Sequence, residues 1–291
     1  MGNNFFQNIW LTIFLFNLST SFILLYLKEL IEAMLIWKRQ LEKVNSLRLQ
    51  ITESKKKNEG LLRFDRCTIR ASDVAGQYYC EKKIELEYLY GEVETETKNQ
   101  GTHFHENLLE GAETVDQEEL WKTVYGKEPV LAMEWLLLAE YNDVILAGQP
   151  DSILFENGVP LVIFEYKFSR SRRTYPSYHV QAGFYGLLLK NLGFDTRKLF
   201  YAIVVADRSA KHDPNLRDNV LETVKNNGQK KTILPIENAL VYMNKFDEQE
   251  AKASLEWAIQ FWKKQREAIS TNNSNKCRVC EYEQECKKTI F

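Results

Sequence analysis

The sequence lacks an excess of charge of either sign. Its 291 residues include 38 basic and 40 acidic side chains, so the formal net charge is −2. This balance excludes a uniformly cationic surface, and any contact with a nucleic acid must rely on local basic patches. With 44% hydrophobic and 27% charged residues, the composition is that of a packed domain.

Cysteine is also scarce, with five residues in the whole chain. An odd number does not fit the disulfide framework of a small secreted domain. Three of the five crowd together near the C-terminus, at Cys277, Cys280 and Cys286. Thiols this close favour a metal or cluster site, for which a fourth ligand must come from elsewhere. The alternative is that the three are unligated.

Charge is absent from the first part of the chain, between Gly2 and Leu27. The apolar stretch Ile9–Leu27 is long enough to cross roughly 30 Å of hydrocarbon as a helix. A signal peptide normally has a basic leading region and a small-residue cleavage site, and neither is evident in this stretch. We therefore expect a single membrane span, with residues 5–27 in the membrane. Positive charge follows the span, so the rest of the chain should stay in the cytoplasm. The alternative is a buried core helix.

Residues 28–53 carry apolar side chains at a 4-3 spacing, which predicts a helix. This helix either pairs with a second copy in a coiled coil, giving a homo-oligomer, or packs one stripe on the domain. The hydrophilic stretch Ser54–Gly60 is typical of a linker. We therefore expect two parts: a span, helix and linker over residues 1–60, and a globular domain over residues 61–291.

The globular part alternates between helices and strands, which indicates an α/β fold. Helices are expected from Ser72 to Gly91, over residues 101–113, from Ser177 to Gly193 and after Asp247. Strands are expected at Val144–Gly148, Pro160–Phe168, Leu199–Ala206 and Asn238–Asn244. Residues 207–234 are polar and suggest loops.

Three charged residues interrupt the apolar hairpin "GQPDSILFENGVPLVIFEYKF". Glu165 and Lys167 are two apart on one strand and share a face, and Asp151 precedes them on the neighbouring strand. Two carboxylates that meet repel each other unless a cation lies between them, and Mg²⁺ or Mn²⁺ suits such oxygen ligands. A nearby ammonium can stabilise charge in a transition state. The pattern predicts a metal-dependent phosphodiesterase centre; the alternative is a solvated strand face.

The motifs "GTHFH", "GQPD", "EYK" and "QAGFY" occur in this order over roughly residues 70–290. In combination they resemble the RecB-like branch of the PD-(D/E)XK nucleases. The resemblance implies a restriction-endonuclease-like core, in which helices flank a central mixed sheet. It also implies that His105, Asp151 and Glu165 hold Mg²⁺ or Mn²⁺, and that Lys167, Gln181 and Tyr185 complete the catalytic site. His103 points elsewhere on its helix. The plain alternatives are a surface or core histidine, and core packing for Tyr185.

A basic run follows the lysine in "KFSRSRRTY". Its arginines can hold the phosphate backbone of DNA through contacts that do not depend on sequence. The alternative is a solvated loop. The residues concerned are Arg170, Arg172 and Arg173.

The segment "SDVAGQYYCEKK" resembles the opening of the CRISPR-associated, iron–sulphur-containing exonucleases within the RecB-like group. This resemblance implies a [4Fe–4S] cluster that staples a helical part of the fold. Its ligands would be Cys80, Cys277, Cys280 and Cys286. Four thiolates fit Zn²⁺ equally well on geometry, so Zn²⁺ is the second candidate. Cys67 is then a spare thiol. Glu81 and Lys82 stand where the family often has Pro-Arg.

The resemblance as a whole implies a metal-dependent DNA exonuclease, which hydrolyses phosphodiester bonds in single strands and at free ends. It also implies a role in CRISPR adaptation, together with the proteins of that pathway. The alternatives are a repair or replication nuclease of the same fold, a nucleic-acid-binding module without activity, and a membrane scaffold dimerised through residues 28–53.

Overall fold

The computed structural model describes residues 35–57, 59–93, 116–169, 171–207, 210 and 213–289. Several sequence predictions fall on residues outside these ranges. They are the stretch Ile9–Leu27, the helix over residues 101–113, His103, His105 and Arg170.

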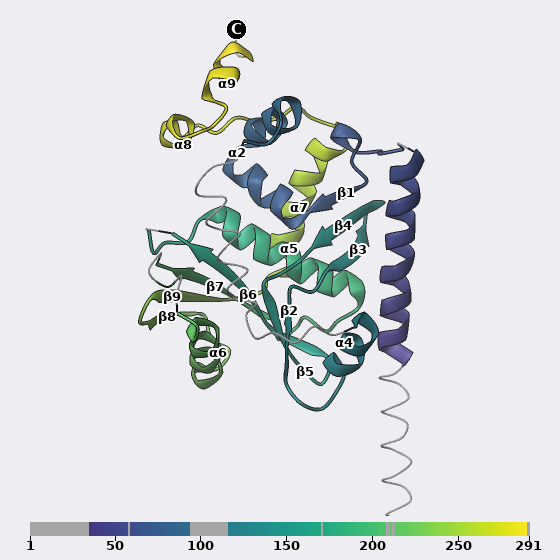
Figure 1. Cartoon of the computed structure of the whole chain (residues 1–291), viewed down its shortest axis with the longest axis vertical. Coiled ribbons are helices and arrows are strands. Elements are labelled where there is room, and N and C mark those ends of the chain that lie inside the picture. The colour runs from purple at the N-terminus through teal and green to yellow at the C-terminus, as the bar shows by residue number, and fades with distance from the viewer. Residues whose placement is uncertain are drawn as a thin grey trace, which may run out of the picture.

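Two mixed sheets form the centre of the described chain (Figure 1). The larger has six strands in the order β2-β5-β6-β7-β9-β8 and the smaller has three in the order β1-β4-β3. The larger sheet comprises β2 (Val130–Met133), β5 (Ser152–Glu156), β6 (Val159–Phe168), β7 (Phe200–Ala206), β8 (Thr232–Ile236) and β9 (Ala239–Lys245). The smaller comprises β1 (Thr68–Arg70), β3 (Leu137–Tyr141) and β4 (Val144–Gly148). The pairs β1–β4 and β6–β7 are parallel, and the others are antiparallel.

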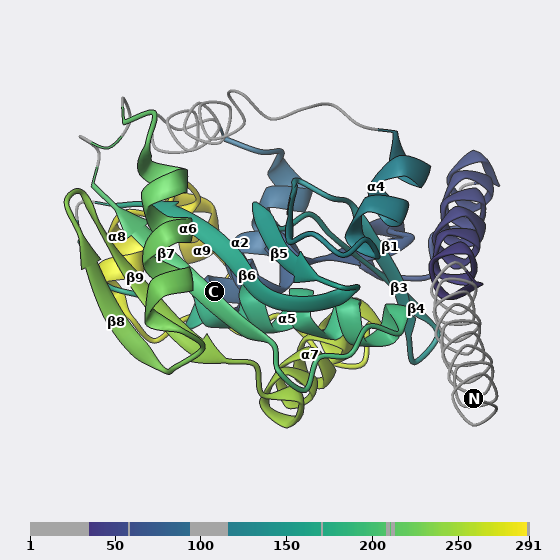
Figure 2. The same ribbon diagram turned by 90° about the horizontal axis from the view of Figure 1, so that it is seen from below.

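Helices cover both faces of the larger sheet (Figure 2). The helices α2 (Ala71–Tyr90), α5 (Pro176–Leu192) and α7 (Glu248–Trp262) pack together on one face, and α6 (Leu216–Asn227) packs on the other. Apart from the helix over residues 35–57, the remaining elements are short: the 3-10 helix η1 (Arg63–Asp65), α4 (Gln117–Val124), α8 (Ser274–Arg278) and α9 (Glu283–Thr289). The predicted mixed α/β fold, with a mixed sheet flanked by helices, is confirmed.

Strand β6 shows how the sheet separates two cores. Ile163 belongs to the core on the α5 side, whereas Phe164 and Tyr166 belong to the core on the α6 side. Successive side chains of a strand point to opposite faces, so Glu165 and Lys167 leave the sheet on the α5 side with Ile163. Because both faces are covered, the strand is apolar almost throughout, and its two charged residues stand out.

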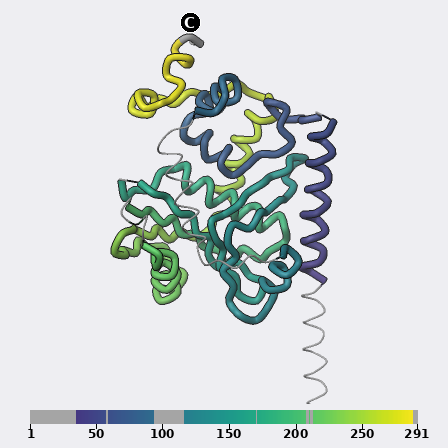
Figure 3. Tube along the Cα trace, viewed as in Figure 1, coloured from purple at the N-terminus to yellow at the C-terminus, as the bar shows by residue number. Residues whose placement is uncertain are grey.

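The helix over residues 35–57 lies along the edge of the domain (Figure 3). Trp37, Val44 and Leu47 are buried in the main core, so the apolar stripe of this helix packs on its own domain. Lys43 Nζ donates to the Asn191 carbonyl oxygen at 2.8 Å. The helix runs through residue 57, into the stretch that we expected to be a linker.

The predicted membrane anchor is not supported by the structure. In the part of the chain that is described, no helix is both long and apolar enough to span a bilayer. The prediction of a nuclease domain anchored to the cell membrane through residues 5–27 is therefore withdrawn.

The prediction of loops over residues 207–234 is wrong for much of that segment. It contains helix α6 and strand β8. Leu216, Val220 and Val224 recur every four residues and are buried against the sheet. Such an i, i+4, i+8 spacing gives a narrow apolar stripe, which the many polar neighbours conceal in the sequence.

Candidate active site

Four side chains from β6 and α5 form a continuous chain of hydrogen bonds. Lys167 Nζ lies 2.6 Å from Glu165 Oε1 and 3.0 Å from Gln181 Oε1. Gln181 Nε2 donates to the Tyr185 hydroxyl at 2.9 Å, and that hydroxyl donates to the Gln149 carbonyl oxygen at 3.2 Å. Gln181 and Tyr185 are one helical turn apart and share a face of α5, as their spacing predicts.

Asp151 joins this group from the chain between β4 and β5. Its Oδ2 accepts a hydrogen bond from the Tyr166 backbone N–H at 2.6 Å, which holds the carboxylate beside β6. Asp151, Glu165, Lys167, Gln181 and Tyr185 line one cavity of about 380 Å³. The structure therefore brings together the described part of the predicted site, from strand β6, helix α5 and the segment that leads into β5.

The ends of α5 explain why the helix holds its position. Pro176 occupies the first turn, where the missing N–H costs no hydrogen bond. Gly193 ends the helix in the left-handed conformation, with φ of 98°. Gly148 allows the close approach of α5 to β4, because a Cβ at that position would lie 2.6 Å from Leu188 Cδ1 and 2.9 Å from Tyr185 Cε1.

The charges of the carboxylates determine the protonation of their neighbours. Burial lowers the pKa of the Lys167 amine, but the negative charges of Glu165 and Asp151 outweigh burial and leave that pKa above its ordinary value. Burial raises the pKa of the Tyr185 hydroxyl well above its ordinary value, and both carboxylates raise it further. At neutral pH Lys167 is therefore an ammonium ion and Tyr185 a neutral hydrogen-bond donor.

Four further polar residues line the cavity and were not among the predicted site residues: Arg70, Ser72, Glu134 and Gln149. Arg70 and Ser72 lie where β1 passes into α2, and Arg70 pairs with Asp73 at 2.9 Å. Glu134 follows β2 with φ of 42°, and its N–H donates to the Asp151 carbonyl oxygen at 3.1 Å. A single Glu inside the apolar run "VLAMEWLLL" was the available signal for Glu134.

The family model of the PD-(D/E)XK nuclease superfamily matches residues 86–287. The chain belongs to this superfamily. As a PD-(D/E)XK nuclease it is a phosphodiester hydrolase that acts on DNA, and members of the superfamily typically use Mg²⁺ or Mn²⁺. The match does not distinguish a RecB-like or CRISPR-associated branch.

No curated protein matches the chain. Among solved structures, the chain resembles the crystal structure of SSO0001 at 16% identity, with a TM-score of 0.43 over 77% of this chain and 88% of that one. It also resembles an alkaline exonuclease (LHK-Exo) from Laribacter hongkongensis at 10% identity, with a TM-score of 0.29 over 77% of this chain and 95% of that one. Both likenesses are weak, and the superfamily assignment rests on the family model.

The carboxylates of this PD-(D/E)XK nuclease fit a hard divalent ion. Mg²⁺ is usually bound by one or two carboxylates together with water and phosphate oxygens, and Asp151 and Glu165 supply two at one cavity. Within the described ranges, no group of three or more His, Cys, Asp or Glu side chains is placed to hold a metal ion. His105, the third predicted ligand, lies outside those ranges.

The predicted DNA-binding arginines have different environments. Arg172 Nε donates to Asp207 Oδ2 at 2.9 Å, so its charge is shared with an acidic partner. Its backbone carbonyl accepts a hydrogen bond from the Tyr242 hydroxyl, which fixes the loop after β6. Arg173 is exposed. DNA binding by Arg172 and Arg173 stays a prediction, and Arg172 would have to exchange its partner for a phosphate.

The four predicted cluster ligands line a second cavity, of about 220 Å³: Cys80, Cys277, Cys280 and Cys286. Helix α2 is interrupted at Cys80, where φ is −173° and ψ is 113°. Burial raises the pKa of the Cys280 and Cys286 thiols. These cysteines do not form a metal-binding group in the described structure, so an iron–sulphur staple within the fold is not supported by it.

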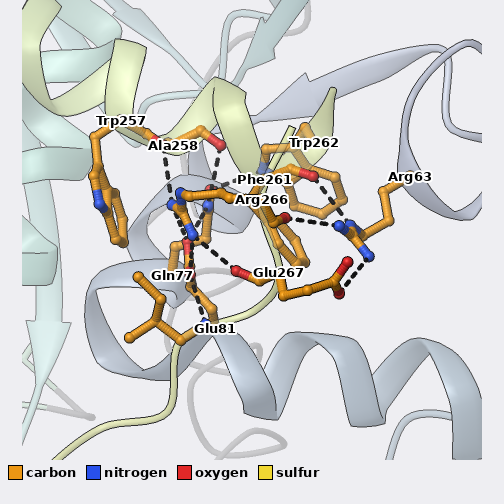
Figure 4. A network of polar contacts seen from close by, with 10 residues as sticks. Arg63, Gln77, Glu81, Trp257, Ala258, Phe261, Trp262, Arg266 and Glu267 are labelled. Carbon is orange, nitrogen blue, oxygen red and sulfur yellow. Dashed lines mark hydrogen bonds and ion pairs between the residues drawn. The ribbon is translucent and has the colours of Figure 1, made fainter. Parts of the chain in front are cut away.

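A network of polar contacts next to Cys80 ties α2 to the segment after α7 (Figure 4). Glu81 is 1% exposed, and its two carboxylate oxygens accept hydrogen bonds of 2.5 and 2.6 Å from Arg266. Gln77 Nε2 adds a bond of 2.8 Å to Glu81, and Trp262 Nε1 donates to Gln77 Oε1 at 2.7 Å. These contacts hold α2, which carries Cys80, against the segment that leads to the other three cysteines.

Proposed function

We propose that this chain is a metal-dependent DNA nuclease that acts on unpaired strands and free ends as an exonuclease. The observation that supports this most strongly is the arrangement of Asp151, Glu165 and Lys167 around one open cavity. Glu165 is on β6 and Asp151 directly precedes β5, which pairs with β6, and the ammonium lies 2.6 Å from Glu165. A solvated strand face, the plain alternative, does not account for Glu165, which is 2% exposed.

In this proposal Asp151 and Glu165 hold the ion, together with His105. When bound, Mg²⁺ or Mn²⁺ acts as a Lewis acid and lowers the pKa of a coordinated water molecule. Lys167 remains charged, because its pKa is raised, and it stabilises the negative charge that develops on the phosphate oxygens. Gln181 directs the amine through its side-chain oxygen, and Tyr185 orients Gln181 in turn.

A cleavage assay on labelled single-stranded and double-stranded DNA, with Mg²⁺ or Mn²⁺, tests this function. Glu165→Ala and Lys167→Ala should each abolish cleavage, whereas the exposed Lys190→Ala on α5 should cleave like the unchanged protein. DNA binding without cleavage under any divalent cation would favour a binding module without activity. Cleavage that survives in Glu165→Ala would contradict the assigned site.

We also propose, with the resemblance as the main support, that Cys80, Cys277, Cys280 and Cys286 hold a [4Fe–4S] cluster, with Zn²⁺ as the second candidate. The structure contributes one observation to this proposal, namely that the four cysteines line the same cavity. Anaerobic purification of the full chain, followed by iron, sulphide and zinc analysis, tests this. Cys80→Ser should lose the metal, and Cys67→Ser, at a cysteine that does not line the cavity, should keep it.

The pathway of this nuclease is proposed from resemblance alone. A role in CRISPR adaptation, with the adaptation proteins as partners, is the first candidate, and DNA repair or replication is the second. Loss of new spacer acquisition in cells that carry Lys167→Ala would support the first. Normal acquisition together with sensitivity to DNA damage would support the second.

A further inference from the structure

At the start of α5, Tyr178 lies beside the proposed catalytic lysine and Tyr175 packs against Tyr178. Tyr178 is in the first turn of the helix, and its ring centroid lies 5.3 Å from Lys167 Nζ. An ammonium over an aromatic face is attracted by the ring quadrupole. Tyr178 therefore bounds Lys167 on a side that Glu165 and Gln181 leave open.

Tyr175 extends this contact towards solvent. Its ring and that of Tyr178 have centroids 5.4 Å apart and are nearly perpendicular, at 88°. In a perpendicular pair, the edge of one ring meets the face of the other, so at least one face of Tyr175 is not covered by Tyr178. Tyr175 is 44% exposed, which makes it one of the most exposed aromatic side chains in the described structure.

The position of Tyr175 is fixed before any ligand binds. It is the N-cap residue of α5, in an extended conformation, and the ring of Pro176 restricts the next φ angle. The Tyr178 backbone N–H donates to the Tyr175 carbonyl oxygen at 2.9 Å. Little conformational freedom is therefore lost when another flat group stacks on the Tyr175 ring.

We infer that Tyr175 is the stacking face for an unpaired nucleobase next to the phosphate that is cleaved. The distance from Lys167 Nζ to the Tyr178 ring is 5.3 Å, and the distance from that ring to the Tyr175 ring is 5.4 Å. Each distance corresponds to the length of one to two stacked nucleotides, at roughly 3.4 Å per nucleotide. Single-strand nucleases hold bases on aromatic faces and the backbone on basic side chains. In this inference the backbone contact is assigned to Arg173, which is exposed two residues before Tyr175.

This inference deepens the proposed function and rests on it. A base inside a duplex is already stacked on both faces, so only an unpaired strand or a frayed end can use Tyr175. The pair Tyr175–Tyr178 would thus select unpaired over fully paired DNA at the active site.

The test combines binding without turnover and cleavage kinetics on the full chain. A single-stranded oligonucleotide that contains 2-aminopurine is titrated in EDTA, where stacking on a tyrosine quenches the probe. Tyr175→Ala should lose the quenching and bind about tenfold more weakly, within the range for one base–aromatic stack. Tyr175→Trp should restore both. Tyr90→Ala, which removes an exposed aromatic ring at the far end of α2, is the matched control and should change neither.

The cleavage assay separates binding from chemistry. With Mn²⁺, Tyr175→Ala should raise KM for single-stranded DNA about tenfold with little change in kcat, and should change KM for blunt duplex DNA less than twofold. Unchanged quenching and KM in Tyr175→Ala, with an active enzyme, would overturn this inference alone. If the unchanged protein cleaves no DNA, the proposed function fails, while the EDTA titration still tests the stacking face.

Discussion

Gln181 Oε1 lies 3.0 Å from Lys167 Nζ, and the other end of the same amide lies 2.9 Å from the Tyr185 hydroxyl. This relationship fixes which way the Gln181 amide faces, because its oxygen can only accept and its nitrogen can only donate. The amine of Lys167 is thereby held between the sheet and the helix. The proposed role of Gln181 is therefore to position Lys167.

Gln181→Ala is expected to lower kcat for DNA cleavage by about 10- to 100-fold, since small displacements of a reacting group carry penalties of this size. KM should change less than threefold, because Lys167 keeps its charge. Steady-state kinetics on single-stranded DNA with Mn²⁺ measure both. His179→Ala, on another face of α5, is the control. A rise in KM at unchanged kcat would show that Gln181 binds DNA directly.

The ion pair of Lys167 with Glu165 predicts a specific loss of stability at alkaline pH. The pKa of Lys167 in the folded protein is raised above its ordinary value of 10.5. The ion pair therefore contributes its full stabilisation at pH values below 10.5. This contribution disappears as the pH rises through the folded value. Lys167→Met should be less stable by about 2 kcal/mol at neutral pH, below the roughly 3–5 kcal/mol for a fully buried pair.

Urea unfolding of both proteins between about pH 7 and pH 11 checks this prediction, and the difference in unfolding free energy should shrink above about pH 10.5. Ionisation of buried tyrosines away from Lys167 destabilises both proteins alike and cancels in the difference. Tyr178, whose hydroxyl pKa burial raises and the Lys167 charge lowers, is replaced by Phe in both proteins. A difference that stays constant over the whole range would mean that Lys167 titrates at the same pH in the folded and unfolded chain.

The close approach at Gly148 predicts that an added methyl group harms the active site. Gly148→Ala would place Cβ 2.6 Å from Leu188 Cδ1 and 2.9 Å from Tyr185 Cε1, so these buried side chains, or the helix α5 that carries them, must move. We expect a cost of about 1–3 kcal/mol in stability and a clear loss of kcat. Gly76→Ala is the control, because its nearest neighbour is the end of the flexible Ile84 side chain. Equal activity of both variants would contradict the role of Gly148.

The sequence was sufficient for the strands and helix that carry the catalytic side chains. β6 and β7 are apolar runs with clear ends, and α5 has Pro176 at its start and Gly193 at its end, so local signals and tertiary packing agree. The convergence of Asp151 with Glu165 also followed, since Asp151 directly precedes β5, and β5 is joined to β6 by a short turn and pairs with it.

The remaining parts of the site depend on contacts between distant segments, which local patterns do not encode. Arg70 enters the cavity because β1 pairs in parallel with β4, more than 70 residues later. Glu134 enters it through a backbone hydrogen bond to Asp151. No glycine or proline at Cys80 predicts the interruption of α2 there. The interruption occurs next to Glu81, which is buried.

The buried pair of Glu81 and Arg266 predicts strong energetic coupling between α2 and the segment after α7. Arg266→Met would leave the Glu81 charge inside the protein, at a cost of about 3–5 kcal/mol. Glu81→Gln should cost less, because the amide still hydrogen bonds within the network. The double variant should be more stable than the sum of the single changes predicts, with a coupling energy of about 1–3 kcal/mol.

Chemical denaturation of the four proteins of this double-mutant cycle measures the coupling. Arg197→Met is the matched control, because the pair Arg197–Asp195 is exposed to solvent and its loss should not change stability measurably. A coupling energy below about 0.5 kcal/mol would mean that the two residues contribute independently. Since Glu81 follows Cys80 directly, Arg266→Met should also reduce the metal content if the cysteines share a ligand, and Arg197→Met should not.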